Sequence, residues 1–328
     1  MSRSFRHIIC AAAAIGAFAA SGVALAAFPD HALTVIVPTP PGGPIDRVAR
    51  TLARGMEQVL GQPVVVDNRL GAAGKIGVQA ALRAPRDGYT LLAVSPSITS
   101  VNPLVDKAVG YDPLKDFEAL GVAAVNAGVV AVRADLPVAS LAELVKYAKA
   151  NPNKLTYASF GVGTSLHLQT EELLQALGIS ARHIPYKGEA QALNALVAGE
   201  VDLMAYVTAT AVPFVENGRL RALATTSSTR WALLPQVPAF AETGIPALKG
   251  YDYHSWVGLA LPAGVPAAAS ARIAAAYRAA LAQPEVKRSL EAQGFSTGTG
   301  GADAMRRTIA DELARNKRLI DSGRVTLE

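Results

Sequence analysis

The sequence predicts an α/β protein built from two domains. Three short apolar strands alternate with helical segments between residues 34 and 94, and this alternation is typical of β-α-β units with parallel strand pairing. A second strand that leads through a glycine-rich turn into a helix follows at residues 155–178. The chain has 328 residues, 51% of them hydrophobic, which is enough for two cores.

The first helix of the N-terminal domain is well marked. An apolar strand at residues 34–37 runs into a proline- and glycine-rich turn, and a helix begins at Pro44, which suits the first helical position. Apolar residues from Ile45 to Leu60 recur at helical spacing, and Gly61 ends the helix. The next strands and the small-residue helix between them are expected at residues 64–67, 90–94 and 71–84.

The start of this helix has the features of an anion-binding turn. A helix start leaves backbone N–H groups without partners and carries about half a positive charge from the peptide dipoles. Gly42 and Gly43 let a carboxylate or phosphate approach that backbone closely, and Thr39 and Pro41 flank them. The loop Ser95–Thr99, with Ser95 and Ser97, is expected at the same edge of the sheet. Taken alone, the motif favours an ordinary tight turn.

A second α/β unit follows the apolar crossing segment 120–132. Ser140 and Glu143 form a capping box, and the strand 155–158 enters the turn 159–167, which repeats the first motif. Further strands are expected at residues 181–185, 201–206, 220–226 and 256–260, and three helices end the chain, the last at 303–320. This order predicts a first domain of residues 27–124 plus 253–328 and a second of 125–252, joined by two crossings that form a hinge.

The N-terminus predicts export. Arg3 and Arg6 precede an apolar run, and Ala24-Leu25-Ala26 resembles a cleavage site, so residues 1–26 are expected to be a removed signal peptide. The only cysteine, Cys10, lies inside that segment. The mature protein should therefore lack thiols and disulfides and lie in the periplasm. Scattered basic residues and few aromatic ones argue against nucleic-acid binding, and the remaining histidines lack metal-ligand spacing, so no metal or cofactor is expected.

Enzyme signatures are mostly absent: there is no G-x-S-x-G elbow, no H-E-x-x-H and no P-loop. Ser165 and His167 stand too close together on one helix start to be a convincing nucleophile and base. They leave a secreted hydrolase acting on a small carboxylic acid or ester as the alternative function. Lys187 is expected at a strand end, where it either meets a ligand carboxylate or lies solvated at the rim.

The residues resemble the Bug or tripartite-tricarboxylate-transporter receptor (TctC-like) proteins, which are periplasmic solute-binding proteins. The resemblance covers almost the whole mature chain and rests on several ordered motifs. They are residues 38–46, 64–69 with 71–77, 87–92, 157–159, 163–168, 183–188, 199–204 and 234–238.

The resemblance implies a type II, Venus-flytrap fold of two α/β domains, each with a mixed, mostly parallel sheet. It also implies a small carboxylate gripped between the domains and delivery to a membrane permease or a sensor, and we expect a monomer. The residues carried over are Pro41, Gly42, Gly43, the Ser95–Thr99 loop, Gly163, Thr164, Ser165 and His167.

The chain departs from many relatives after Leu203-Met204, where it has Ala205-Tyr206-Val207-Thr208 in place of an acidic and amide pair, and in the glycine-rich turn, where Phe160 and Val162 replace more polar residues. The residues of interest are Tyr206, Thr208, Phe160 and Val162. These four residues are expected to shape the pocket around the distal part of the solute, and to make it less polar. A Tyr or Phe at such a position is core filler nearly as often.

Overall fold

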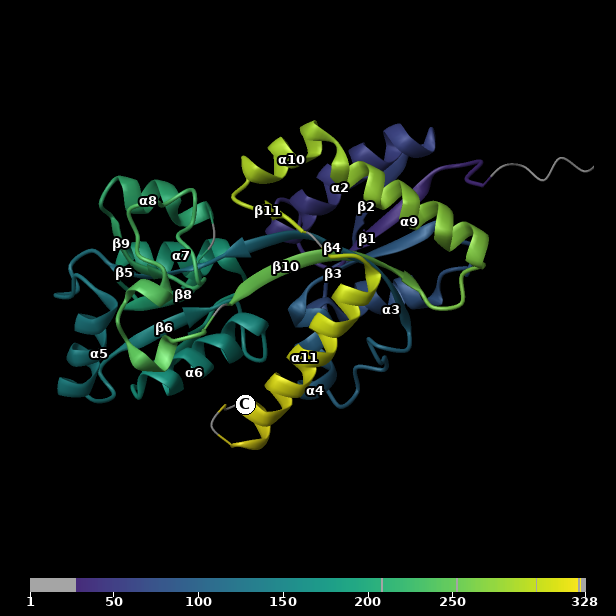
Figure 1. Ribbon diagram of the computed structural model, residues 1–328. Helices are drawn as coiled ribbons and strands as arrows, with labels where there is room; N and C mark the ends of the chain where they lie inside the picture. Colours follow the sequence, from purple (N-terminus) through teal and green to yellow (C-terminus); the bar gives the residue numbers. More distant parts are fainter. Residues whose placement is uncertain (1–27, 208, 252, 299, 324, 326–328) are drawn as a thin grey trace, which may run out of the picture.

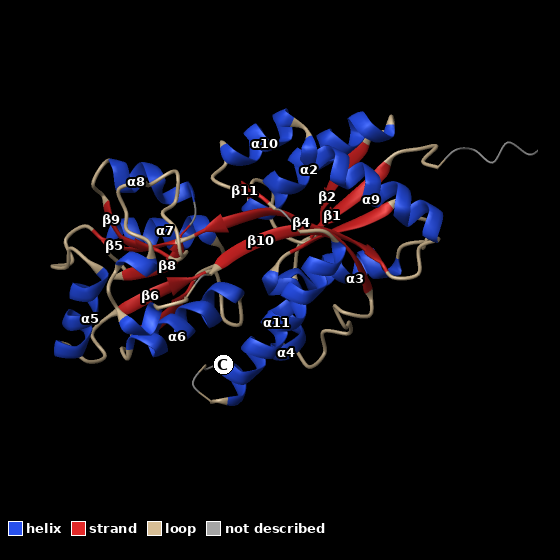
Figure 2. Ribbon diagram, viewed as in Figure 1, coloured by secondary structure: helices blue, strands red, loops and turns tan. Residues whose placement is uncertain are grey.

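The computed structural model describes residues 28–207, 209–251, 253–298, 300–323 and 325. Two sheets with flanking helices lie beside each other and are linked by long strands that run from one sheet to the other (Figure 2). The expected signal peptide with Cys10, and Thr208, fall outside the described residues. None of the helices in the described part of the chain is long and apolar enough to cross a membrane.

The first sheet has the strand order β11-β4-β10-β3-β1-β2. Its strands are β1 (Leu33–Val37), β2 (Val64–Asn68), β3 (Thr90–Val94), β4 (Phe117–Ala127), β10 (His254–Pro262) and β11 (Ser296–Thr297). The pairs β1–β2 and β1–β3 are parallel, whereas β10 pairs antiparallel with both β3 and β4.

The second sheet has the order β7-β6-β8-β5-β9. Its strands are β5 (Val129–Arg133), β6 (Thr156–Ser159), β7 (Arg182–Pro185), β8 (Leu203–Val207) and β9 (Leu220–Thr225). Strand β6 is parallel to β7 and β8, and β5 is antiparallel to β8 and β9. Both sheets are mixed, as expected, but their antiparallel share is larger than expected because β4, β5 and β10 run along the crossings.

One strand order is repeated in the two domains. In each sheet the first local strand (β1 or β6) lies between the second (β2 or β7) and the third (β3 or β8). The strand that has just crossed from the other domain (β10 or β5) follows, and then the fourth local strand (β4 or β9). The helix after β1 and the helix after β6 are therefore equivalent in the fold.

Helices cover both faces of the first sheet. They are α2 (Pro44–Leu60), α3 (Lys75–Arg83), α4 (Asn102–Val105), α9 (Ala267–Ala282), α10 (Pro284–Glu291) and α11 (Ala302–Asp321), with the short turns η1 (Ala72–Gly74) and η2 (Ser97–Val101). One face packs against α2, α9 and α10 and the other against α3 and α11 (Figure 1). Val48, Leu52 and Met56 of α2 are fully buried, and each contributes about 1.5–3 kcal/mol by leaving water.

The second sheet is flanked by α5 (Leu141–Ala150), α6 (Ser165–Leu177), α7 (Glu189–Ala198) and α8 (Val212–Glu216), with the turns η3 (Ala209–Ala211), η4 (Phe240–Glu242) and η5 (Pro246–Leu248). These elements share one core with the strands. Ser140 caps α5 as expected, because its hydroxyl accepts the N–H of Glu143 at 3.2 Å.

Two chain crossings and one helix hold the domains together. The chain leaves the first sheet through β4 into β5 and returns through β10, which gives the two crossings that the sequence predicts (Figure 1). Helix α11 adds a contact that the sequence does not reveal: Leu319 packs with Val101 of η2 and Leu168 of α6, from the other domain. The expected domain boundaries stay a prediction; β4 ends at Ala127, and β10 begins at His254.

Candidate functional site

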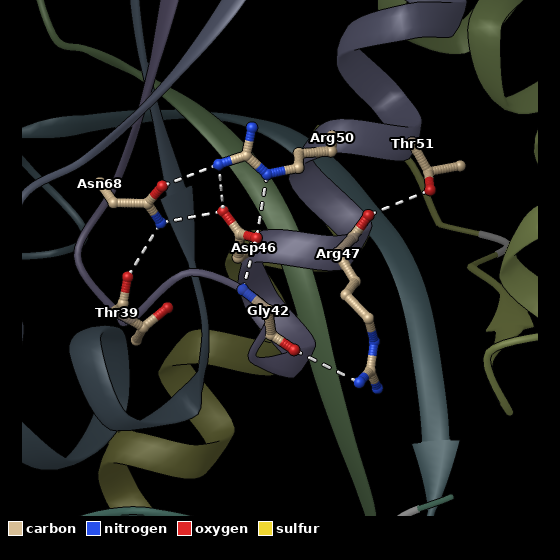
Figure 3. Close-up of polar contacts among 7 residues, drawn as sticks. All are labelled: Thr39, Gly42, Asp46, Arg47, Arg50, Thr51 and Asn68. Atoms are coloured by element: carbon tan, nitrogen blue, oxygen red, sulfur yellow. Dashed lines mark hydrogen bonds and ion pairs between the residues drawn. The ribbon is translucent and has the colours of Figure 1, made fainter. Parts of the chain in front are cut away.

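At the start of α2, the carboxylate of Asp46 from the same helix folds back and bonds the turn before the helix (Figure 3). The N–H of Gly42 donates to Asp46 Oδ2 at 2.8 Å, and Asn68 Nδ2 donates to Asp46 Oδ1 at 2.9 Å. Arg50 Nε donates to Asp46 Oδ2 at 3.0 Å. Burial alone would raise the pKa of this carboxyl, but the hydrogen bonds from Arg50, Gly42 and Asn68 outweigh it and hold the pKa below its usual value.

In this geometry the first glycine turn already has hydrogen-bond partners within the chain, and its role in solute binding stays a prediction. The N–H of Gly43 donates to Pro40 O at 3.3 Å, so the N–H groups of both glycines have partners within the chain. Asp46 is 2% exposed and sits three residues into the helix, where a carboxylate interacts well with the helix dipole. The turn therefore already carries a negative charge. Gly42 has a positive φ of 78°, and Thr39 Oγ1 nearby is buried and without a partner among the described residues.

The start of α6 is built differently. Thr164 is the cap, and its hydroxyl accepts the N–H of His167 at 3.3 Å and donates to Gly161 O at 2.8 Å. The N–H of Gly163 donates to His167 Nδ1 at 3.1 Å, so the ring is neutral and carries its proton on Nε2. Burial lowers the pKa of His167 to about 4, with a smaller contribution from His183. This helix start has no acidic residue in its first turn.

A stack of rings lies behind His167. The rings of His167 and His183 are stacked with centroids 4.0 Å apart, and Tyr157 stacks on His183 at 4.8 Å. Ser159 Oγ and His183 Nε2 form a hydrogen bond of 2.6 Å, and burial lowers the pKa of His183 as well. Strands β6 and β7 thereby fix the ring whose nitrogen holds the Gly163 turn. The sequence alone assigns no role to Ser159 or His183.

The two domains meet at a pair of serines. Ser97 Oγ, at the first position of η2 after β3, forms a hydrogen bond of 2.9 Å with Ser165 Oγ, at the first position of α6. Ser97 Oγ also accepts the backbone N–H of Ser165 at 3.3 Å. The structure therefore brings together the two loops that the sequence singled out in different domains, Ser95–Thr99 and 163–167.

The loop that carries Ser97 is anchored from behind. The C=O of Ser95 accepts the N–H groups of Ile98 and Thr99, both at 3.0 Å, which starts the π-helical turn η2. Ser100 Oγ donates to Glu312 Oε2 of α11 at 2.6 Å, and Trp256 Nε1 donates to the other carboxylate oxygen at 2.8 Å. Burial raises the pKa of Glu312. Helix α11 thus fixes the position of the serine loop.

Two predicted residues lie elsewhere. Lys187 is exposed beyond β7. Tyr206 is 5% exposed in the core of the second domain, where its hydroxyl donates to Gln169 O at 3.3 Å and pairs with the Tyr251 hydroxyl at 3.1 Å. Its φ of 58° is unusual for so large a residue. Tyr206 is thus packed as core, and its role in selection stays a prediction, as does that of Thr208, which is not described.

The hydrolase alternative finds no support in the geometry. Ser165 Oγ pairs with Ser97, whereas His167 Nδ1 accepts the N–H of Gly163, so the two side chains point to different partners. Within the described residues no cluster of three His, Cys, Asp or Glu side chains is arranged to hold a metal ion. A hollow of about 960 Å³ beside β4, α9 and α10 contains none of the predicted site residues.

The fold and the meeting of two loops between two domains define a two-domain solute-binding protein. The tripartite tricarboxylate transporter family receptor matches residues 48–324, and this chain belongs to that family. A UPF0065 protein from the tcbD-tcbE intergenic region of Pseudomonas sp. (strain P51) is 37% identical over 300 residues, which cover 90% of this chain and 87% of that protein. The family that the sequence resembles is thereby confirmed.

Solved structures with a similar fold support the same family. Rpa4515 of R. palustris with adipate has a TM-score of 0.81 at 33% identity and covers 90% of this chain and 97% of its own. The periplasmic binding protein BugD has a TM-score of 0.79 at 33% identity, covering 91% and 99%. MatC from Rhodopseudomonas palustris with bound malate has a TM-score of 0.78 at 29% identity, covering 89% and 100%. The two-domain binding-protein fold is confirmed, and the chain is a receptor of this family rather than an enzyme.

Proposed function

We propose that this chain is an extracytoplasmic receptor that binds a small carboxylate between its two domains and delivers it to the membrane permease of a tripartite transporter. The observation that carries the proposal is the contact between Ser97 of one domain and Ser165 of the other. Hydroxyl and backbone N–H groups meet there, at the end of a helix that bears a partial positive charge.

The electrostatics of the two helix starts favour α6 over α2 as the place where the solute carboxylate binds. Asp46 already occupies the positive end of α2, whereas the corresponding side chain of α6, His167, is neutral. A solute carboxylate oxygen that replaces Ser97 Oγ as the acceptor of the Ser165 N–H gains this dipole without meeting another negative charge. Thr39 and the exposed turn at Pro41 and Gly42 then face the distal part of the solute.

The neighbours support a dicarboxylate. One carries adipate and another carries malate, both small molecules with two carboxylates. We infer that the solute of this chain is of the same class, that residues 1–26 are removed during export, and that the mature receptor works in the periplasm. Closure is a population shift, because the contacts on both domains form only when the domains approach.

The test is a thermal-unfolding screen of the purified mature protein against mono-, di- and tricarboxylates, with adipate and malate included. A true solute adds RT ln(1 + [L]/Kd) to the free energy of unfolding, about 2.7 kcal/mol at a hundredfold excess over Kd, and the melting temperature rises accordingly. Native mass spectrometry of protein from its source identifies a solute that remains bound. Stabilisation by none of the carboxylates, or turnover of the bound compound, would refute the receptor role.

The cellular half of the proposal has its own test. Intact mass of the periplasmic protein reports whether the chain begins after Ala26, and retention of residues 1–20 would contradict export. Uptake of the identified solute by cells lacking the receptor, or lacking the permease, should fall in both cases. Normal uptake without the permease would favour delivery to a sensor protein.

A further inference from the structure

The edge of the first sheet at β2 is open. Strand β2 is the last strand on its side of the sheet and is paired, within the described chain, with β1 alone. The N–H of Leu33 donates to Pro63 O and the N–H of Arg69 donates to Val37 O, both at 2.9 Å. The alternation of a parallel ladder then directs the N–H and C=O groups of Val64, Val66 and Asn68 away from β1. These groups can pair with an added strand.

Exposed apolar side chains gather at this edge. Four large hydrophobic residues are exposed in the described part of the protein, and three of them lie in the segment 65–76. Val65 is 52% exposed, Leu70 47% and Ile76 53%. Proteins usually protect an edge strand with charges, proline or a covering segment, and an apolar edge left open marks an interaction site.

A hollow of about 510 Å³ adjoins the edge strand. Thr34 and Ile36 of β1 and Thr90 of β3 form its floor, and Ile76 and Ala80 of α3 stand at its side. Val65 is the register partner of Thr34, so its side chain lies on the same face of the sheet. Thr34 and Thr90 stand near the beginnings of their strands, whereas the solute site lies at the strand ends. The surface is therefore separate from that site.

The charge of the hollow indicates its occupant. Two arginines, Arg69 and Arg83, are among the lining residues, together with Ala84 and the five residues above, and none of the eight is acidic. Arg69 Nε already donates to Asp67 at 2.7 Å, whereas Arg83 is exposed in the last turn of α3. An acidic partner complements this rim. A second copy of the chain would bring the same arginines to the interface.

We propose that the β2 edge and this hollow form a docking surface for an extended, acidic segment of a partner protein. The segment adds a strand beside β2 through Val66, places an apolar side chain against Val65 and Ile76, and sets a carboxylate near Arg83. This mode of recognition takes affinity from main-chain hydrogen bonds and specificity from alternate side chains. The inference goes beyond the proposed function, because it concerns a protein partner and not the solute.

Two substitutions remove separate parts of the surface. Val66→Pro deletes an N–H that points away from β1, so it blocks an added strand and keeps the β1–β2 ladder. Arg83→Glu reverses the charge at the rim. Lys146→Glu, at an exposed residue of α5 in the other domain, is the matched control. Melting temperature and solute binding of each variant show that the fold and the cleft are kept; if Val66→Pro fails to fold, Arg83→Glu carries the test.

The probe is a labelled hexapeptide of alternating glutamate and valine, compared with one in which lysine replaces glutamate. We expect saturable binding of the glutamate peptide, with shifts of the amide signals of residues 64–69. Its Kd should rise at least about fivefold in Val66→Pro and Arg83→Glu and stay unchanged in Lys146→Glu.

Equal binding of the lysine peptide, or no saturable binding of the glutamate peptide, would overturn the proposal. So would sedimentation that shows a dimer of the receptor lost in Val66→Pro, because the edge would then pair with a second copy. If the solute binds neither the unmodified chain nor any variant, the proposed function is refuted, whereas the peptide-binding test of the docking surface is unaffected.

Discussion

The starts of α2 and α6 occupy equivalent places in the two domains, but the N–H of the glycine before each helix has a different kind of acceptor. In each, the side chain four residues after a glycine folds back onto that glycine's N–H: Asp46 onto Gly42, and His167 onto Gly163. One acceptor is a carboxylate with a lowered pKa, and the other is a neutral imidazole. The difference teaches that similar glycine turns need not be similar anion sites: the first holds an internal anion, whereas the second holds a neutral ring, and this is why we propose that the solute carboxylate binds at the second.

The largest expected effect is on stability in acid. Burial places the folded pKa of His167 at about 4, below its unfolded value. Its contribution is therefore fully present above about pH 6.5 and is lost as the pH falls toward 4, by about 3 kcal/mol at most. His183 acts in the same direction. Asp46, whose pKa is also lowered, loses its contribution only below about pH 3.9.

Denaturant unfolding at pH 7 and pH 4.5, monitored separately in the two domains, checks this difference. As the pH falls, the second domain should lose stability before the first domain does. A His167→Asn variant should lose most of the pH dependence between these values, and an unaltered dependence in that variant would assign it to other groups.

Placing a carboxylate at the start of α6, as there is at the start of α2, should lower solute affinity. His167→Asp puts a carboxylate at the start of α6, as in α2, and repulsion should raise the Kd for the carboxylate found in the screen by about fifty- to a hundredfold. His167→Asn, which adds no charge, should have a much smaller effect. Calorimetry on both folded variants makes the comparison, and equal losses would show that geometry, not charge, matters here.

Removing the internal anion of α2 should affect the fold more than binding. Asp46→Ala leaves the N–H of Gly42, Asn68 and the half-exposed Arg50 without their acceptor, which should cost about 2 kcal/mol of unfolding free energy. Asp46→Asn keeps one acceptor oxygen and should cost less. Urea unfolding gives both values. A solute affinity that drops as far as in His167→Asp would contradict the assignment of the carboxylate to α6.

The smallest effect is expected at the serine contact. Ser97→Ala removes the hydroxyl that meets Ser165 across the domains, which should cost about 1 kcal/mol and shift the solution ensemble toward open forms. Small-angle scattering without solute should show a larger radius of gyration. The exposed Ser180→Ala is the control, and identical profiles for both variants would show that the serine pair does not hold the domains together.

Much of the fold was predictable because its signals are local. The stripe of Val48, Leu52 and Met56 and the following Gly61 mark α2, and the apolar runs mark the strands. The expectation failed where partners come from distant sequence. Helix α11 reads as an ordinary amphipathic helix, yet Glu312 anchors the serine loop through Ser100, 212 residues away in the chain. The sequence left open whether Tyr206 is a pocket or a core residue; the hydrogen bonds of its hydroxyl to Gln169 and Tyr251 pack it in the core, and its role in selection stays a prediction.

The sequence by itself determined the element order, the two crossings, the family and the two loops that meet between the domains, because periodicity, turn residues and motifs lie in neighbouring positions. Only the tertiary structure decided which glycine turn already bonds a carboxylate of its own chain. Both turns contain glycines before a helix, and the sequence alone does not reveal where a side chain four residues on will point. Asp46 is held by Arg50 of its own helix and by Asn68 of β2, and His183 of β7 stacks on His167, so both acceptors depend on a residue that is distant in the sequence.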